Sequence, residues 1–468
     1  NSIRMKGDLN IPVAMTEFDY LQELKQTASM NKVFKNYIGL GYNGTITPSA
    51  ILRNVFQNPG WYTQYTPYQA EIAQGRLEAL LNFQTMVSDL TSLPIANASL
   101  LDEGTAAAEA MAMFYAQKNK RVKNDDDIAN VFFVDNKVLD QSYDVLITRA
   151  KPLNIKVVRG DWKSYKFTEK TFGVLLQYPA KDGSEEDYRA FTAEANDKNV
   201  FVTVAADILS LALLMPPGEW GADAVVGNTQ RLGVPMGYGG PHAAYFATKE
   251  KFKRQIPGRI IGVSIDEQDN PALRMALQTR EQHIRREKAT SNICTAQALL
   301  AIMASMYAVY HGPNGIRQIA ARIHTLAEVL EDNLQDLGYK LTNKYYFDTL
   351  SFEVDKKRQA SIKKIALAEG VNFHYTSNTI QVSLDETVGM DDLDQIIRIF
   401  AKAKRKSFKA MVVQPRDMNF PMKLIRETEY MTHPIFNKYH TESEMMRYIK
   451  RLENKDLSLM HSMISLGS

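Results

Sequence analysis

The spacing of apolar residues changes near residue 130, and the change separates two kinds of predicted element. Before it, turn clusters such as 39–44 and 58–61 alternate with helical patterns, and from Glu71 the apolar positions predict a helix of about 20 residues. After it come short apolar runs at 131–134, 156–158, 173–176, 200–204 and 224–226, with helical stretches at 139–150 and 185–198. Strands and helices in this alternation predict a largely parallel sheet covered on both faces, to which 243–247 adds a parallel or antiparallel strand.

A further set of elements predicts a smaller domain after residue 312. A polar stretch at 278–292 leads into a helix that ends near Gly312-Pro313, where we expect a domain break. Beyond it the pattern predicts a helix at 316–337, a strand at 350–354, a helix at 360–369, two strands around 377–378 and a helix containing 393–400. We therefore expect an N-terminal segment (1–35), a large α/β domain (36–312), a small α+β domain (313–414) and a tail (415–468) with a capping box at 441–444.

The composition is that of a globular protein and excludes several functional classes. The 468 residues are 45% hydrophobic and 23% charged, which allows roughly two to four domains with a buried core. A net charge of +3 gives no reason to expect nucleic-acid or membrane-surface binding, and no apolar run approaches the roughly 20 residues of a membrane span. The one cysteine, Cys294, excludes an internal disulfide and fits a reducing compartment. We expect a soluble, cytoplasmic protein of several domains.

Four motifs can carry chemistry, and each also has a purely structural interpretation. The stretch 237–242 can form a nest of backbone donors for an anion or a simple turn, and 102–109 can hold a phosphate at a helix start or simply pack closely. The tyrosines of 62–71 suit a pocket wall or surface packing, and the basic run 280–288 suits an anion or a solvated helix face. The eight histidines show no metal-ligand spacing, so we expect no metal site. The residues alone indicate an α/β enzyme that handles an anion.

These segments, taken together and in order, resemble one protein family. They read GYNGTITP at 41–48, NPGWYTQYTPYQAE at 58–71, ANASLLDE at 96–103, GVPMGYGGPH at 233–242 and REQHIRREKATSNICT at 280–295. Over essentially its whole length the chain resembles the glycine decarboxylase P-protein of the glycine cleavage system. The resemblance implies the fold of pyridoxal-phosphate-dependent transferases of the aspartate aminotransferase type (fold type I). It also implies decarboxylation of glycine and transfer of the remaining aminomethyl group to the lipoyl arm of the H-protein.

Within that family the chain resembles the N-terminal half, which lacks the Schiff-base lysine. The other half has a His-Lys pair after its last buried strand, whereas the matching place here reads Gln230-Arg231, and a guanidinium does not deprotonate in proteins. Where the other half places an aspartate for the pyridine nitrogen, this chain has Ala205, and Asp207 comes two residues late on the strand. The resemblance therefore implies a degenerate cofactor site, with Thr105, Ala205 and Asp207 at its positions, and no covalently bound pyridoxal phosphate. This half is expected to complete the active site of the lysine-bearing half and to be inactive alone.

The resemblance also suggests which residues face that composite active site, namely Tyr65, Tyr68, Glu71, Thr47 and His433. We keep three hypotheses: the non-lysine half of an oligomeric glycine decarboxylase, a non-catalytic assembly domain, and an independent aminotransferase, against which the missing lysine counts. A bacterial cytoplasm is favoured over a mitochondrial matrix. Because 432–468 resembles the opening of the second half, we expect a truncated two-half chain. Its tail from Arg426 is expected to be poorly anchored or to dock on a second chain.

Overall fold

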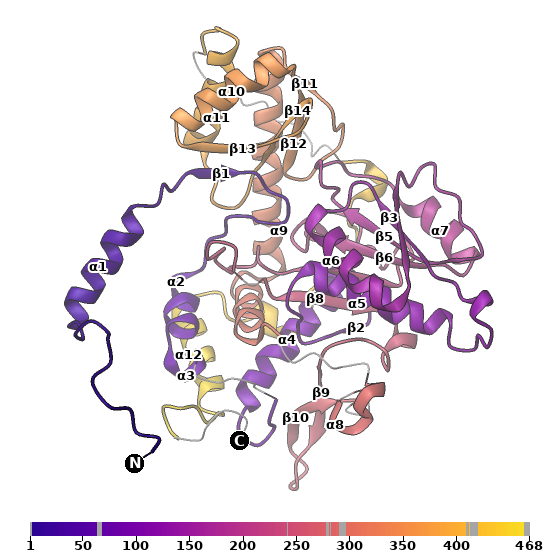
Figure 1. The fold of residues 1–468 in the computed structure, drawn as a ribbon, viewed down its shortest axis with the longest axis vertical. Helices are drawn as coiled ribbons and strands as arrows, with labels where there is room; N and C mark the ends of the chain where they lie inside the picture. The colour runs from indigo at the N-terminus through magenta and orange to yellow at the C-terminus, as the bar shows by residue number, and fades with distance from the viewer. Residues whose placement is uncertain are drawn as a thin grey trace.

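The centre of the fold is a seven-stranded sheet. A computed structural model describes residues 2–62, 68–240, 242–277, 280, 282–289, 296–408, 411 and 420–462 (Figure 1). The strands lie in the order β2-β8-β7-β6-β5-β3-β4. They are β2 (Ile95–Ala96), β3 (Val131–Asp135), β4 (Lys156–Gly160), β5 (Thr171–Tyr178), β6 (Phe201–Ala206), β7 (Ala224–Asn228) and β8 (Ala244–Thr248). As the apolar runs predict, β3 to β7 are parallel, and β8 pairs antiparallel with β7.

Helices cover both faces of this sheet, because successive strand residues point to opposite sides. Phe132 packs in one core with α5 (Glu103–Lys118) and α6 (Asp140–Ala150). The next residue, Phe133, belongs to the other core, to which the remaining long helices contribute: α4 (Gln74–Thr91), α7 (Arg189–Asp197) and α9 (Ala298–Asp336). The sheet is therefore buried on both sides, which explains its nearly continuous apolar strands.

A second, five-stranded sheet forms the small domain, drawn in orange in Figure 1 apart from the indigo β1. Its order is β1-β13-β14-β12-β11, with β1 (Lys35–Tyr37), β11 (Lys340–Leu341), β12 (Thr349–Glu353), β13 (Val371–Tyr375) and β14 (Thr379–Ser383). The helices α10 (Lys356–Ala368) and α11 (Met390–Ala403) pack with it. The predicted limit between residues 35 and 36 falls inside β1, which pairs parallel with β13 and so lies in the small sheet.

The long helix α9 leads from the large sheet to the small one (Figure 1). The sequence predicts two helices that meet near Gly312-Pro313. The structure confirms this: α9 consists of two helical segments that meet at a kink, where Gly312 adopts a non-helical φ of 64° and Pro313 follows. A side chain at this glycine would meet His440 Cε1 at 2.8 Å, so the close approach of the tail also requires glycine here. The domain boundary at this point stays a prediction.

The expectation of a poorly anchored tail is wrong for the described residues 420–462. The tail contains a short helical turn (Pro434–Asn437) and α12 (Glu442–Glu453), whose predicted capping box between Thr441 and Glu444 is present. Apolar tail residues are buried in the main core of this chain: Met431, Phe436, Met445, Tyr448 and Leu452. The tail is an integral part of the large domain because these side chains fill its core. Residues 464–468, whose echo of 38–42 suggests a second repeat, lie outside the described part.

The remaining elements are short and lie at the surface of the large domain. They are α2 (Ser49–Ile51), a π-helical turn (Leu52–Phe56), α3 (Pro59–Tyr62), the hairpin β9 (Ile260–Ile265) and β10 (Pro271–Ala276), and α8 (Gln282–Arg285). Ahead of β1, α1 (Glu17–Ser29) stands apart from the body of the molecule (Figure 1). Among the described helices, none combines the length and the apolar character that crossing a bilayer requires.

Candidate functional site

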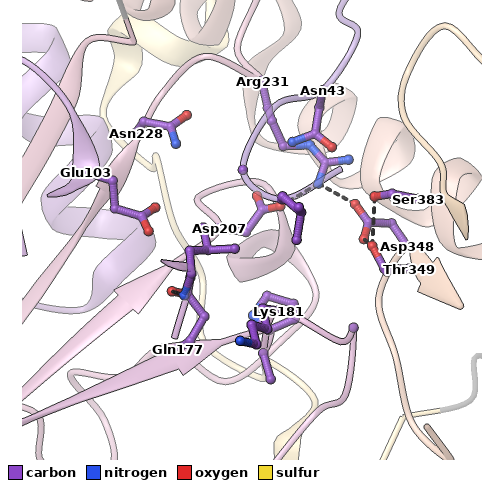
Figure 2. A pocket seen from close by; sticks show the side chains of 16 residues that line it. Asn43, Glu103, Gln177, Lys181, Asp207, Asn228, Arg231, Asp348, Thr349 and Ser383 are labelled. Atoms are coloured by element: carbon purple, nitrogen blue, oxygen red, sulfur yellow. Dashed lines mark hydrogen bonds and ion pairs between the residues drawn. The ribbon is translucent and has the colours of Figure 1, made fainter. Parts of the chain in front are cut away.

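A cavity lies where three neighbouring parallel strands end. Gln177 near the end of β5, Asp207 just after β6 and Asn228 at the end of β7 line it (Figure 2). The small domain closes the other side with Asp348, Thr349 and Ser383. Ligands of open α/β sheets bind at the carboxyl ends of the strands, so this cavity of about 70 Å³ is the candidate site.

Arg231 dominates the electrostatics of this cavity. Its side chain is 4% exposed, and its Nη1 donates to Oδ2 of Asp207 and, at 2.5 Å, to Oδ2 of Asp348 (Figure 2). Burial lowers the pKa of Arg231, but the charges of the two aspartates outweigh it and raise that pKa, so Arg231 stays cationic. Because Asp207 belongs to the large domain and Asp348 to the small one, the guanidinium holds the two domains together. We call these three residues the arginine clamp.

The segment 43–47 adds a second connection between the domains. Asn43 and Gln230 exchange two hydrogen bonds: Nε2 of Gln230 donates to the Asn43 carbonyl at 2.7 Å, and the Asn43 N–H donates to Oε1 of Gln230 at 3.1 Å. The Gly44 N–H donates to Oδ2 of Asp385 in the small domain at 2.6 Å. Thr47 Oγ1 donates to the Gly233 carbonyl at 2.8 Å. Gln230 and Arg231, which stand where the family's other half has His-Lys, are thus both engaged in structural contacts.

Two carboxyl groups already occupy the N-terminal end of α5. Asp102 caps this helix, and its Oδ1 accepts a hydrogen bond from the Thr105 N–H at 2.7 Å. Glu103 is buried beside it, and this burial raises its pKa to about 7 although Ser142 Oγ donates to Oε1 at 3.3 Å. A helix N-terminus favours anions, and here the chain's own carboxylate fills that role.

A neighbouring cavity of about 130 Å³ offers no cation to an anionic ligand. Its polar lining includes Asp102, Glu103, Ser142, Asn228 and His242. Burial lowers the pKa of His242, which is therefore uncharged near neutral pH. Its ring meets that of Tyr42 edge-on, with 4.4 Å between centroids. The surroundings of the α5 N-terminus are acidic or neutral.

Among the described residues, the other sequence candidates do not line either cavity. Tyr65 falls outside the described residues. Tyr68 is half-buried with the Arg259 guanidinium 4.4 Å from its ring centroid, and Glu71 is exposed just ahead of α4. His433 is exposed, and its Nδ1 accepts a hydrogen bond from the Ile435 N–H at 3.2 Å. The structure therefore brings together Arg231 and Asp207, places Thr105 at the adjacent helix start, and leaves Tyr68, Glu71 and His433 elsewhere.

Sequence reasoning missed the residues that the small domain contributes. Asp348 directly precedes β12, and Glu386 follows β14, where its Oε1 accepts a hydrogen bond from the Tyr307 hydroxyl at 2.9 Å. Because β12 and β14 are antiparallel and Thr349 pairs with Ser383, the start of β12 and the end of β14 lie at the same edge of the small sheet. The partner of Asp348 lies 117 residues away in sequence, so spacing alone could not identify the pair.

The residues around the cavity do not fit the pyridoxal phosphate that the resemblance implies. Arg231 offers no amine, and the lysine among the described lining residues, Lys181, directs its Nζ to Oδ1 of Asp140 at 3.1 Å. Asp207 is held by Arg231 and by the Leu209 N–H, so its carboxylate is not free to pair with a ring nitrogen, and Ala205 is buried within β6. The phosphate position at α5 is taken by Asp102. Nor does any cluster of His, Cys, Asp and Glu among the described residues suit a metal ion.

Comparisons with known proteins agree on one family. The model of the glycine cleavage system P-protein family matches residues 1–400. The "glycine dehydrogenase (decarboxylating)" of Nostoc sp. is 56% identical over 476 residues, which cover all of this chain and 48% of that protein. The enzyme of the same name from Flavobacterium johnsoniae is 54% identical, with all of this chain and 49% of that protein covered. The chain thus spans about half the length of the curated relatives that it matches.

Solved structures confirm the predicted fold class. A glycine decarboxylase (P-protein) in inhibitor-bound form matches with a TM-score of 0.77 and 30% identity, covering 85% of this chain and 92% of that one. The Lactobacillus brevis glutamate decarboxylase shares the fold alone, with a TM-score of 0.60 at 12% identity over 86% of this chain and 96% of that one. The fold is that of pyridoxal-phosphate-dependent enzymes of fold type I. Together with the family match, these findings confirm the resemblance: the chain belongs to the glycine cleavage system P-protein family.

Proposed function

We propose that this chain is the non-lysine half of a glycine dehydrogenase (decarboxylating). In that enzyme glycine is decarboxylated and its aminomethyl group passes to the lipoyl arm of the H-protein. The single observation that supports this division of roles is the arginine clamp, because a buried guanidinium held between the half-buried Asp207 and the buried Asp348 stands where the other half has its reactive lysine. This half then contributes walls to an active site whose pyridoxal phosphate is bound by the lysine-bearing half.

The segment around Tyr68 and Glu71 is our candidate for that contribution. It lies at the entry to α4, with Glu71 exposed and Tyr68 showing part of its ring. A tyrosine offers apolar area and a hydroxyl donor, which suit a small zwitterion such as glycine. An exposed carboxylate can pair with an arginine or an ammonium group of the other half. The bacterial relatives and the one cysteine support a bacterial cytoplasmic location.

A second candidate function is that of an assembly domain without direct active-site contacts. The observation that favours it concerns Gln230 and Arg231, which stand where the other half has its His-Lys pair. Both side chains make structural hydrogen bonds where the two domains meet. The third hypothesis, an independent aminotransferase, is opposed by the same contacts.

Kinetics separate the first two candidates. The test protein is a full-length hybrid in which this chain replaces the matched part of the Nostoc relative. Tyr68→Phe and Glu71→Gln should each lower kcat/KM for glycine by at least about tenfold, or ~1.4 kcal/mol of transition-state stabilisation, with unchanged melting. Tyr345→Phe and Glu353→Gln, which make the same changes in the small domain, serve as matched controls. Unaltered turnover and bicarbonate exchange in an intact assembly would favour the assembly domain instead.

A further inference from the structure

The stretch ahead of the small sheet contacts almost nothing in its own chain. Every residue from 2 to 33 is exposed, and none of the 13 residues of α1 is buried by the part of the chain that the structure describes. The stretch is tethered at β1, where the Lys35 N–H donates to the Gly370 carbonyl at 2.9 Å. In Figure 1 it is the indigo ribbon that stands apart from the body. We call residues 2–34 the arm.

The arm is too apolar to be explained as a solvated tail. Its exposed large apolar side chains are Ile3, Met5, Leu9, Ile11, Val13, Met15, Phe18, Tyr20, Leu21, Leu24, Met30 and Val33. In α1, Phe18, Leu21 and Leu24 share one side with Ala28, whereas Gln22 and Gln26 lie on the other. The exposed fractions of Phe18, Leu21 and Leu24 are 70%, 53% and 50%. Contiguous apolar surface of this kind marks an interaction site.

The length of α1 also indicates that the arm packs against a partner. Isolated helices shorter than about 12–15 residues are marginal in water, because most helical stability in proteins comes from packing of an apolar face. α1 has 13 residues, and its apolar face has no partner among the described residues. The Thr16 side chain does cap it, since Oγ1 accepts from the Asp19 N–H at 3.2 Å. A capped amphipathic helix without tertiary contacts is suited to packing against another protein surface.

The body carries further exposed apolar side chains on elements near one another. Phe56 ends the π-helical turn, and Met446 lies on α12, which contacts that turn through Arg53. Ile46 and Tyr62, which are 54% and 51% exposed, flank the same short helices. In Figure 1 the arm descends on the side of the molecule where α2, α3 and α12 lie. In the sequence, Tyr62 lies six residues ahead of Tyr68.

We propose that the arm is a docking element whose occupant is the lysine-bearing half of the enzyme, an inference that rests on the proposed function. The matched relatives hold as much chain again as this one, so in them a second half is always present on the same molecule. Because the second half is covalently linked to the arm, its effective concentration is on the millimolar scale. It therefore outcompetes a separate second copy of this chain for the arm. The arm has 33 residues, enough to supply the roughly 20–30 residues per side of a standard interface.

The charge of α1 argues against a membrane surface as the occupant of this helix. α1 carries Glu17, Asp19 and Glu23 against Lys25 alone, and the polar face of a membrane-surface helix is typically rich in Lys and Arg. The anionic groups of α1 would be repelled by an anionic bilayer. A protein surface that covers the apolar stripe meets no such repulsion.

Hydrogen exchange tests the docking. Amides of 17–29 are compared in the isolated chain at low micromolar concentration and in the full-length Nostoc hybrid. We expect at least tenfold greater protection in the hybrid. Leu21→Ser with Leu24→Ser should abolish the gain, whereas the matched polar-face variant, Gln22→Ser with Gln26→Ser, should keep most of it.

Each other outcome overturns the proposal. If the isolated chain shows the same protection as the hybrid, and this protection rises with the concentration of the chain, then the arm docks on a second copy of this chain. Equal and low protection in both proteins would leave the arm without a protein partner in this enzyme. The glycine decarboxylase activity of the hybrid reads out the proposed function separately: an active hybrid with an unprotected arm contradicts the docking alone, and an inactive but folded hybrid contradicts the proposed function.

Discussion

At the scale of single residues, Arg231 has a structural role at the place where, on the proposed function, the other half carries its reactive lysine. A lysine at this place could lose its proton and react, but an arginine remains cationic and presents several donors in a fixed plane. Here those donors meet Asp207 from one domain and Asp348 from the other, with the Asp348 side chain only 9% exposed. An arginine at this place therefore cannot form a Schiff base and also joins the two domains.

Arg231→Met should destabilise the chain strongly, because it leaves the buried carboxylate of Asp348 and the half-buried carboxylate of Asp207 without their cation. We expect the free energy of unfolding to fall by about 3–5 kcal/mol, measured by urea denaturation at pH 7. Adding Asp207→Asn and Asp348→Asn to the variant should recover a large part of the loss. A loss below about 1 kcal/mol for Arg231→Met would show that the clamp contributes little.

Glu103 makes stability depend on pH. Its pKa is about 7 in the folded chain because of burial, against 4.5 without that environment, so the folded state binds the proton more tightly. Its contribution to stability is therefore full below pH 4.5 and is lost as the pH rises towards 7. Glu103→Gln should gain on the order of 1–3 kcal/mol relative to the parent between pH 5 and 8. If the free energies of unfolding of the two proteins change with pH in the same way across this range, the raised pKa of Glu103 is refuted.

The sequence was informative at Arg231 and Asp207 and uninformative about their partners. Both residues follow predicted strands, so their meeting at one sheet edge could be expected. Asp348 and Glu103 could not be assigned roles, since one depends on how the small domain closes and the other on burial that no local pattern shows.

At the scale of elements, the tail completes the large domain by capping a helix far away in sequence. α4 begins without a side-chain cap of its own, and Asp456 supplies one: Oδ1 accepts from the Gly75 N–H at 2.6 Å and Oδ2 from the Arg76 N–H at 3.1 Å. Nη1 of Arg76 also donates to Oδ2 of Asp456, at 2.5 Å, and both side chains are buried. Such caps satisfy donors that a helix start leaves unpaired.

This contact explains why the tail prediction failed while its local elements were correct. The capping box and apolar stripe of α12 lie within a few residues of one another and are visible in the sequence. The anchoring contact joins residues 380 positions apart, which no periodicity reveals. A pattern can therefore predict that a helix is amphipathic without showing which surface receives it.

Gly75→Ala should detach α12. A Cβ at this position would meet the Leu452 carbonyl O at 2.0 Å, so the helix would have to move away. We expect residues 426–462 to become sensitive to limited proteolysis and the melting temperature to fall. Gly389→Ala, where a Cβ would have its nearest contact at 3.7 Å, is the matched control. Equal protease resistance of both variants would contradict the packing described here.

At the scale of the whole molecule, two domains are held around a cavity whose lining does not fit pyridoxal phosphate. The order of strands and helices could be predicted because buried parallel strands have a distinctive apolar pattern. The pairing of β1 with the small sheet could not, since it depends on a three-residue strand that lies far from its partner β13 in sequence. Family membership, rather than the pattern, indicates that a second half supplies the missing chemistry.

Covalent trapping of pyridoxal phosphate tests this central claim most directly. The full-length Nostoc hybrid is loaded with pyridoxal phosphate, reduced with borohydride, digested and mapped by mass spectrometry. The account predicts one labelled lysine, in the half contributed by the Nostoc protein, and no labelled peptide from residues 1–468. A labelled lysine within this chain, above all Lys181 in the cavity wall, would contradict it.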